Sequence, residues 1–270
     1  MLQTLPSRLW RNTRKVHRDL RHRVLGIPWM QVRSDDCFLF SYPRSGNTWL
    51  RHIMLALAYD TVPKDFEDLE NLMPAIDTLE FPARLKRMPA ERRFFKSHLP
   101  YSPYFLEGKI VYVVRDGRDV MISYYDFFKK IYNYRGSFRD FERKFTGGFL
   151  RYGTWYNNVR SWVKHKSHPN MRLIRFEDLR ANPIDTVGSV AEFCDLPSDE
   201  ETLRRAVEVS SVDRVHSTMR SWNDATGTGF VGGVSGGGKT NWRDKLTEEE
   251  NDRFVAHAGD LLQELGYPLA

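Results

Sequence analysis

The stretch from Asp36 to Trp49, which reads DCFLFSYPRSGNTW, decides the fold of this chain. Cys37 to Tyr42 is a short apolar run rich in aromatic residues, as is typical of a buried strand. Pro43 cannot continue a strand ladder, and Gly46 permits a tight loop. Apolar residues then recur at the spacing of one helix face, at positions 50, 53, 54, 57 and 58. The stretch therefore predicts a strand, a tight polar loop and a helix.

The loop between that strand and that helix has the expected geometry of an anion site. A strand end followed by a helix start directs backbone N–H groups and the helix dipole at one point. Arg44 adds a positive charge, and Ser45, Asn47 and Thr48 add short hydrogen-bond donors. We therefore expect a phosphate-binding loop, although its letters do not fit the GxxxxGK[ST] pattern of nucleoside-triphosphate P-loops.

Length and composition indicate a globular α/β protein. With 270 residues, 41% of them hydrophobic and 13% aromatic, the chain can bury a large core. Two cysteines provide neither a disulfide framework nor a metal cluster, and the eight histidines show no paired-ligand spacing, so we expect no metal site. No apolar run approaches the roughly 18 residues of a membrane span, and the basic N-terminus lacks an apolar signal core. We expect a cytoplasmic protein.

The charge of the chain is concentrated at its start. The formal net charge of +6 favours anionic partners, and much of the excess lies in residues 1–30, where Asp19 is the only acid. Apolar residues near helical spacing predict a basic amphipathic helix for this extension: Leu9, Val16, Leu20 and Val24. Such a helix either makes peripheral contact with an anionic membrane or packs its stripe on the domain. Because the basic excess is not interleaved with exposed aromatics, we expect no nucleic-acid partner.

Strand and helix patterns alternate along the rest of the chain. Strand-like segments fall at 92–97, 109–114 and 171–176, short helices and loops at 61–90, and helical stripes at 120–128, 152–163 and 247–265. A capping box of Thr247 and Glu250 opens the last helix. The alternation predicts an α/β fold with a parallel sheet flanked by helices. Since no internal repeat or linker interrupts it, we expect a single domain over residues 31–270.

Two further motifs carry chemistry. Residues 114–125, VRDGRDVMISYY, run from a strand end into a helix, the usual position of a ligand site in a parallel sheet. There Arg115 and Arg118 can make charge-assisted bonds to phosphate. Residues 95–100, FKSHLP, place His98 between the two phosphate motifs. Histidine titrates near neutrality and suits proton transfer.

Taken in order, these motifs resemble those of the sulfotransferases that use 3′-phosphoadenosine 5′-phosphosulfate (PAPS). Residues 42–49, YPRSGNTW, are similar to the 5′-phosphosulfate loop YPKSGTTW; residues 114–125 are similar to RxxxDVxxSYY, and residues 95–100 to FxKTHLP. The resemblance covers roughly residues 36–265 and indicates a divergent or bacterial member of the cytosolic type. It implies the sulfotransferase fold, which is related to that of P-loop kinases.

The resemblance also implies roles for single residues in an in-line sulfuryl transfer from PAPS to a hydroxyl or amine. His98 would be the general base, and Arg44 and Lys96 would neutralise charge on the sulfuryl and leaving oxygens. Backbone N–H groups of the loop would hold the 5′-phosphate: Ser45, Gly46, Asn47 and Thr48. Arg115 and Ser123 would hold the 3′-phosphate, leaving 3′-phosphoadenosine 5′-phosphate (PAP) as product. Trp49 either stacks on the adenine or packs at the helix start.

Two segments depart from the family pattern. Residues 175–179, RFEDL, resemble the YEDL segment, but Phe176 replaces its tyrosine. The family's RKGxxGDWK loop, which closes over the 3′-phosphate, aligns with residues 235–243 and ends in Asn241-Trp242-Arg243. Ser235 and Gly236 stand where the family has Arg and Lys, so we expect Lys239, together with Arg243, to supply the charge.

Two alternative functions stay open. Residues 233–240, GVSGGGKT, satisfy the Walker pattern letter for letter and would suit a P-loop nucleotide kinase or ATPase. A true Walker loop follows a buried strand and opens an apolar helix, and this segment has neither context. The other alternative is a non-catalytic protein that binds anions or membranes through residues 1–30. The sequence leaves the acceptor (a small molecule, or a lipid or glycan) and the oligomeric state undetermined.

Overall fold

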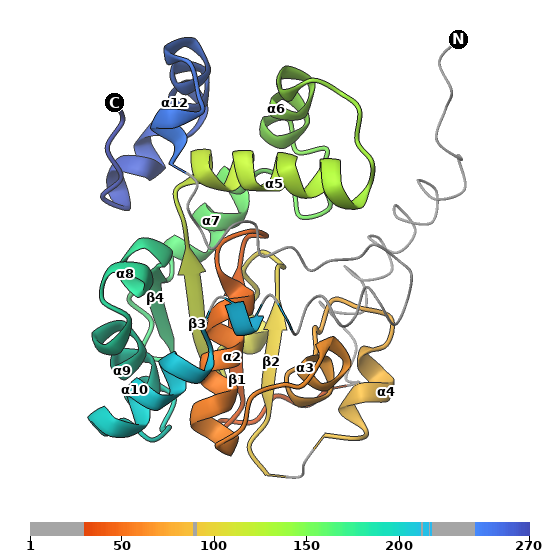
Figure 1. The fold of residues 1–270 in the computed structure, drawn as a ribbon, viewed down its shortest axis with the longest axis vertical. Helices are drawn as coiled ribbons and strands as arrows, with labels where there is room; N and C mark the ends of the chain where they lie inside the picture. The colour runs from red at the N-terminus through yellow and green to blue at the C-terminus, as the bar shows by residue number, and fades with distance from the viewer. Residues whose placement is uncertain (1–29, 89–90, 212, 216, 218–240) are drawn as a thin grey trace.

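The computed structural model describes residues 30–88, 91–211, 213–215, 217 and 241–270 (Figure 1). The predicted basic helix before Met30 therefore lies outside the described residues, as do the Walker-like segment 233–240 and Lys239. None of the helices in the described part of the chain combines the length and apolar character that crossing a membrane requires.

A four-stranded parallel sheet forms the centre of the molecule. Its strands are β1 (Cys37–Ser41), β2 (Phe94–Ser97), β3 (Lys109–Val114) and β4 (Met171–Arg175), in the order β2-β1-β3-β4. Cys37 pairs with Phe94 on one side of β1 and with Lys109 on the other. The predicted parallel sheet is confirmed, and all four strands lie within the predicted segments.

Helices connect the strands and cover both faces of the sheet (Figure 1). They are α2 (Asn47–Tyr59), α3 (Phe66–Leu72), α4 (Phe81–Leu85), α5 (Gly117–Ile131), α6 (Phe138–Thr146), α7 (Trp155–Val163), α8 (Phe176–Ala181), α9 (Pro183–Phe193), α10 (Glu200–Val209) and α12 (Glu248–Glu264), with short 3₁₀ turns η1 (Pro103–Phe105) and η3 (Trp242–Asp244). The predicted capping box is present, because Thr247 accepts from the N–H of Glu250 at the start of α12. Helix α2 begins at Asn47, three residues before Leu50, where the apolar stripe starts.

The pleat of β1 divides the hydrophobic core into two layers. Phe38 and Phe40 point to one face, where the ring of Trp162 on α7 lies 4.4 Å from that of Phe40. Cys37 and Leu39 point to the other face, which is covered by α2, α9 and α10. The side chains from Cys37 to Phe40 are fully buried, as expected for an apolar run with helices on both faces of its sheet.

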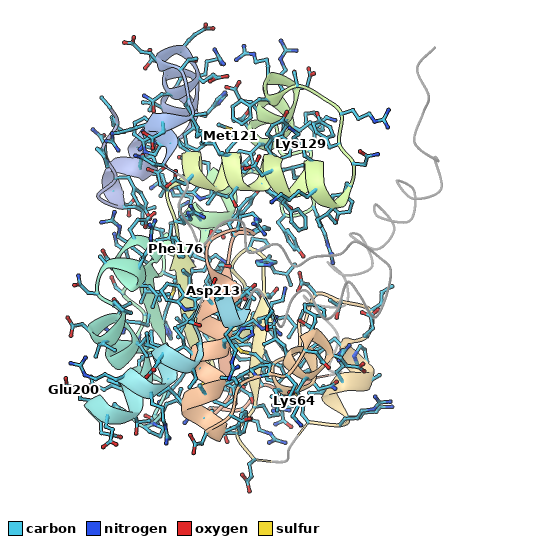
Figure 2. All side chains as sticks on the ribbon, viewed as in Figure 1. Lys64, Met121, Lys129, Phe176, Glu200 and Asp213 are labelled. Carbon is cyan, nitrogen blue, oxygen red and sulfur yellow. The ribbon has the colours of Figure 1, made fainter. Side chains whose placement is uncertain are left out.

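All strands of a parallel sheet end at the same edge, and the predicted motifs lie there. The loop after β1, the turn after β2 and the start of α5 after β3 follow three neighbouring strands. Helix α5 crosses above this edge, with α6 and α12 beyond it (Figure 1). Phe176 is labelled in Figure 2 at the end of β4, between the strands and α5. The fold therefore gathers residues that are far apart in the sequence at one edge of the sheet.

Candidate active site

The loop after β1 has a backbone shape that the sequence only partly indicated. Arg44 and Gly46 both have positive φ, +71° and +93°. A Cβ on Gly46 would lie 2.3 Å from the Phe176 ring, so only glycine fits this position. The backbone oxygen of Gly46 accepts from the N–H groups of Trp49 and Leu50, which starts α2 directly after the loop. The first N–H groups of a helix have no partner within it, so those before Trp49 are suited to binding an anion.

Several buried polar atoms around this loop have no hydrogen-bond partner in the part of the chain that the structure describes. They are Oγ of Ser45, Nε1 of Trp49, and Nε and Nη2 of Arg115. Ser45 and Arg115 are both buried. Buried polar groups are normally hydrogen-bonded, and unpaired ones are costly. A cluster of unpaired donors beside a helix start is a fitting site for a phosphate-bearing ligand.

Arg115 links the second motif to the loop. Its Nη1 donates to the backbone oxygen of Arg44 at 3.1 Å, and its guanidinium lies 4.7 Å from the centroid of the Phe176 ring. Burial lowers the pKa of Arg115, while Asp119 and Glu177 oppose that shift. An arginine keeps its charge under these conditions. Phe176 therefore supports both Gly46 and Arg115, through its ring rather than through a hydroxyl.

Arg44 reaches across to α5. Its Nε donates to Oγ of Ser123 at 3.2 Å, and its guanidinium lies 5.0 Å from the centroid of the Phe127 ring. Burial and the neighbouring Arg115 lower the pKa of Arg44 to about 10, so the side chain is charged at neutral pH. The structure thus brings together Arg44, Arg115 and Ser123, as the two motifs predicted. The amide of Asn47, in contrast, donates back to Oγ of Ser41 at 3.2 Å.

His98 is held at the end of β2 in one orientation. Its Nδ1 lies 2.8 Å from the backbone oxygen of Ser41, which can only accept, so Nδ1 carries the hydrogen and Nε2 the lone pair. The Tyr152 ring meets the imidazole edge-on at 5.3 Å, and Asn158 donates to the backbone oxygen of His98 at 3.0 Å. Burial, then the neighbouring Lys96, lowers the pKa of His98 to about 3. The imidazole is therefore neutral at physiological pH.

Asp77 is a member of this cluster that sequence reasoning missed. The segment before it runs along the outer edge of β2. The N–H of Lys96 donates to the backbone oxygen of Pro74, and the N–H of Ile76 donates to the backbone oxygen of Lys96, both at 3.0 Å. This pairing places Asp77, which is only 1% exposed, beside Lys96 and the hydroxyl of Tyr152. Its one sequence signal is an apolar run that ends in an acid, which also occurs in ordinary surface strands.

Arg118 and Arg243 lie further along the same edge. Arg118, expected as a phosphate ligand, is fully buried, forms an ion pair with Asp116 at 2.7 Å and stacks on Trp242 at 3.6 Å. Those contacts make it a structural residue. Arg243 is exposed in η3, and its Nη2 donates to the backbone oxygen of Ala270 at 2.7 Å. Trp242, next to Arg243, packs on α5 through Arg118, so η3 lies close to the second motif.

Comparison with known proteins identifies the family of the chain. The family described as the sulfotransferase domain matches residues 34–266. The chain belongs to the sulfotransferase family. Among curated relatives, it is 27% identical to mouse sulfotransferase 4A1 over 249 residues, 87% of this chain and 82% of that protein. It is 33% identical to mouse sulfotransferase 1B1 over 203 residues, 69% of this chain and 67% of the relative.

Solved sulfotransferase structures share the fold of this one. Mouse sulfotransferase SULT7A1 complexed with PAP has a TM-score of 0.68 at 22% identity and covers 89% of this chain and 88% of its own. Retinol dehydratase in complex with androsterone and inactive cofactor PAP has a TM-score of 0.69 at 21% identity, over 92% and 85% of the two chains. The predicted P-loop-kinase-related sulfotransferase fold is therefore confirmed.

Proposed function

We propose that this sulfotransferase moves the sulfuryl group of PAPS to a hydroxyl or amine of an acceptor. The observation that carries the proposal is that the end of β2, with Lys96 and a fixed, neutral His98, adjoins the loop after β1, which carries Arg44 and the unpaired Oγ of Ser45. Two solved structures of the same fold, both in complex with PAP, support the choice of cofactor.

The residues around the loop fit PAPS. The N–H groups from Ser45 to Thr48 and the unpaired Oγ of Ser45 would hold the 5′-phosphosulfate. Arg115, with two unpaired guanidinium nitrogens, would hold the 3′-phosphate together with Ser123. Arg243 and Lys239 are proposed to complete that site from the segment before α12. Trp49 meets Phe176 edge-on at 6.4 Å and is proposed to border the adenine.

The proposed chemistry divides between a base and two cations. PAPS supplies an activated sulfuryl group with PAP as leaving group. His98 accepts the proton of the acceptor at Nε2, the atom that the bond from Nδ1 to Ser41 leaves free. The charges of Arg44 and Lys96 stabilise the negative charge that builds up on the sulfuryl and leaving oxygens. As in phosphoryl transfer, positioning and electrostatics supply most of the rate.

The acceptor is proposed to be a small molecule, or a lipid or glycan, that enters beside His98. Retinol dehydratase, which shares the fold, is solved in complex with androsterone and in complex with retinol. We further propose that residues 31–270 act as one domain in the cytoplasm, with residues 1–30 making peripheral membrane contact. Neither a metal nor a nucleic acid takes part in the proposed reaction.

A calorimetric titration tests the proposal, with PAP, AMP and ATP–Mg²⁺ as ligands. We expect PAP alone to bind tightly, because AMP lacks the 3′-phosphate that Arg115 would contact and the triphosphate does not fit the loop after β1. A screen of phenols and steroid alcohols with labelled PAPS then identifies the acceptor class. Tight binding of ATP–Mg²⁺ would favour the kinase or ATPase alternative, and no binding of any of the three would favour the non-catalytic one.

A further inference from the structure

We infer that Asp77 is a positioning residue for sulfuryl transfer, whose buried carboxylate holds the Tyr152 ring against His98 from a segment that pairs with Lys96. The inference rests on the proposed function for its catalytic meaning. Asp77 is 1% exposed, and we assign it no contact with the substrate: it acts through its neighbours.

One hydrogen bond holds the side chain of Asp77 and another holds its backbone. The hydroxyl of Tyr152 donates to Oδ2, and Nη2 of Arg151 donates to the backbone oxygen of Asp77 at 2.5 Å. The other oxygen, Oδ1, has no hydrogen-bond partner among the described residues. Because the same Tyr152 ring lies edge-on against the imidazole of His98, the carboxylate fixes one wall of the base. Asp77 is thus connected to His98 through a single side chain.

The segment that carries Asp77 is itself anchored to α2. Arg51 on α2 forms a buried ion pair with Glu70 at 2.9 Å, and the other oxygen of Glu70 accepts from the N–H of Ala75 at 3.0 Å. From Ala75 the chain pairs with Lys96 along β2 and then reaches Asp77. The position of the carboxylate is therefore set by the core of the domain rather than by a mobile surface loop.

Asp77 is the carboxylate that most favours the charged form of Lys96. Burial lowers the pKa of Lys96; Asp77 and Glu70 oppose that shift, whereas Arg51 and Arg151 add to it. Glu70 is already neutralised by its ion pair with Arg51. Asp77 is the carboxylate left to balance Lys96, and Arg151 bonds to its backbone rather than to its carboxylate.

The carboxylate of Asp77 stays ionised in this setting. Burial alone would raise the pKa of Asp77, but Lys96, His98, Arg151 and the Tyr152 hydroxyl together bring it below its ordinary value. A permanent negative charge beside Lys96 keeps the ammonium protonated where burial would otherwise favour the neutral amine. Without that charge, Lys96 would lose its proton at lower pH and could no longer stabilise the transferring group.

The test compares wild type with Asp77→Asn, which keeps the shape of the side chain and removes its charge. The ¹³C signal of the Lys96 ε-carbon, assigned with Lys96→Arg, is titrated by NMR without nucleotide. We expect the Lys96 titration to move to lower pH in Asp77→Asn and to stay unchanged in Glu80→Gln, a control in which an exposed carboxylate of the same segment is neutralised. An unchanged Lys96 titration in Asp77→Asn, or an equal shift in Glu80→Gln, would overturn the inference.

Kinetics provide the second readout. For Asp77→Asn, we expect kcat near neutral pH to fall at least about tenfold, the alkaline limb of the pH–rate profile to move to lower pH, and PAP affinity to be kept. If that variant does not fold, Tyr152→Phe, which lacks the hydroxyl that bonds to Asp77, replaces it in the test. We expect this variant to have a lower kcat while Lys96 titrates as in wild type. An unchanged kcat would show that the bond from Tyr152 to Asp77 does not help to position His98. If the wild-type protein transfers no sulfuryl group, the proposed function fails. The NMR titration needs no turnover, so it still tests whether Asp77 affects the titration of Lys96.

Discussion

At the scale of single residues, Gly46 shows how closely the loop and its support fit. Its φ of +93° lies in the region that favours glycine, and the Phe176 ring occupies the space where a Cβ would project. The same ring stacks on Arg115. Phe176 can support the loop without the family's hydroxyl because its contacts to Gly46 and Arg115 are made by the ring face and edge.

We predict that Gly46→Ala destabilises the protein by about 2–5 kcal/mol, since the left-handed backbone costs about 1–2 kcal/mol and a forced contact in a packed region about 1–3 kcal/mol. The free energy of unfolding in urea measures this. Gly153→Ala is the matched control: its φ is +74°, but nothing lies within 4 Å of the added Cβ, so only the backbone cost remains. Equal losses in the two variants would contradict the role given to Phe176.

A second prediction concerns His98. Replacing it with alanine should reduce turnover about 100-fold or more, the usual contribution of a general base, while PAP affinity measured by calorimetry stays close to that of wild type. His257→Ala, an exposed histidine on α12, is the control. A His98→Ala enzyme with most of its kcat would remove this residue from the role of base.

The pH dependence of wild type checks the same assignment. Burial and Lys96 lower the pKa of His98 to about 3, so Nε2 is unprotonated in the free enzyme at any pH well above that value. The kcat/KM of the free enzyme should therefore show no acid limb from His98 between about pH 5 and 8. An acid limb near the ordinary histidine pKa would mean that the imidazole is less buried than in this structure.

At the residue scale, the motifs picked out Arg44, Arg115 and Ser123, and the structure places them together. Each lies at a strand end or on the first turns of the next helix, and their roles toward PAPS stay predictions. Asp77 could not be predicted, since its position depends on the pairing of its segment with Lys96 across the edge of β2. Arg118 illustrates the reverse case, because a motif position alone does not reveal that a side chain is buried against Trp242.

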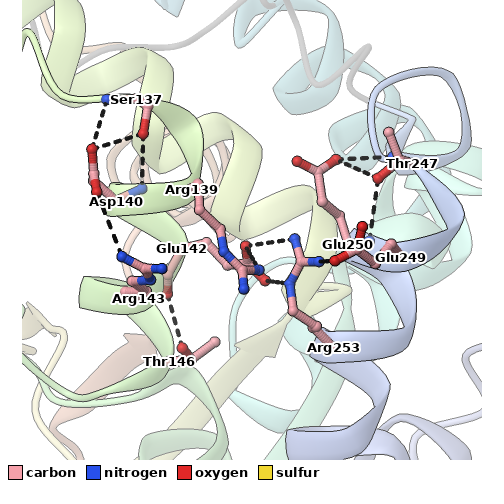
Figure 3. Close-up of polar contacts among 10 residues, drawn as sticks. All are labelled: Ser137, Arg139, Asp140, Glu142, Arg143, Thr146, Thr247, Glu249, Glu250 and Arg253. Carbon is pink, nitrogen blue, oxygen red and sulfur yellow. Dashed lines mark hydrogen bonds and ion pairs between the residues drawn. The ribbon is translucent and has the colours of Figure 1, made fainter.

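At the scale of elements, α6 and α12 are joined by an ionic network (Figure 3). Glu142 on α6 is buried and accepts two hydrogen bonds from Arg253 on α12, at 2.9 and 3.0 Å, and a third from Arg139 at 3.0 Å. Arg253 also pairs with Glu249 one turn earlier. Each helix begins with its own capping box, so the network joins two helices whose N-termini are stabilised locally.

We predict that Glu142→Gln lowers the free energy of unfolding by about 1–3 kcal/mol, because charge-assisted hydrogen bonds to a buried carboxylate are lost. Urea denaturation measures the loss. The control is Arg143→Gln, which removes an exposed pair with Asp140 at 4.0 Å and should change little. A Glu142→Gln protein as stable as the control would show that apolar packing alone holds the two helices together.

Elements with a strong period were predicted well from sequence. The four strands and α12, which begins at a capping box, were found because apolar spacing and caps are local signals. Helix α6 was missed although both signals are present: Phe138, Phe141 and Phe145 lie at the spacing of one helix face, and Ser137 and Asp140 form its capping box. Helices α8 to α10 follow one another closely, and their boundaries depend on packing against α2 and β4.

At the scale of the whole molecule, the order of the strands separates two halves of the candidate site. β1 lies between β2, which carries Lys96 and leads to His98, and β3, which leads to Arg115. The proposed acceptor side and the proposed 3′-phosphate side therefore lie on opposite flanks of one central loop. The alternation of strands and helices predicted a parallel sheet, but the strand order could not be derived from it, because any of several orders satisfies the same alternation.

The same strand order has a consequence for how the protein is made. β1 is the first of the four strands to leave the ribosome, yet its two sheet partners are encoded far downstream, so both of its edges stay bare for much of synthesis. A bare, fully apolar strand is prone to intermolecular pairing. Helix α2, the next element to emerge, packs on only one face of it. The yield of expressed protein should therefore depend on the time between the synthesis of β1 and that of β3. During this time the strand before the phosphate loop is the segment that chaperones would need to protect.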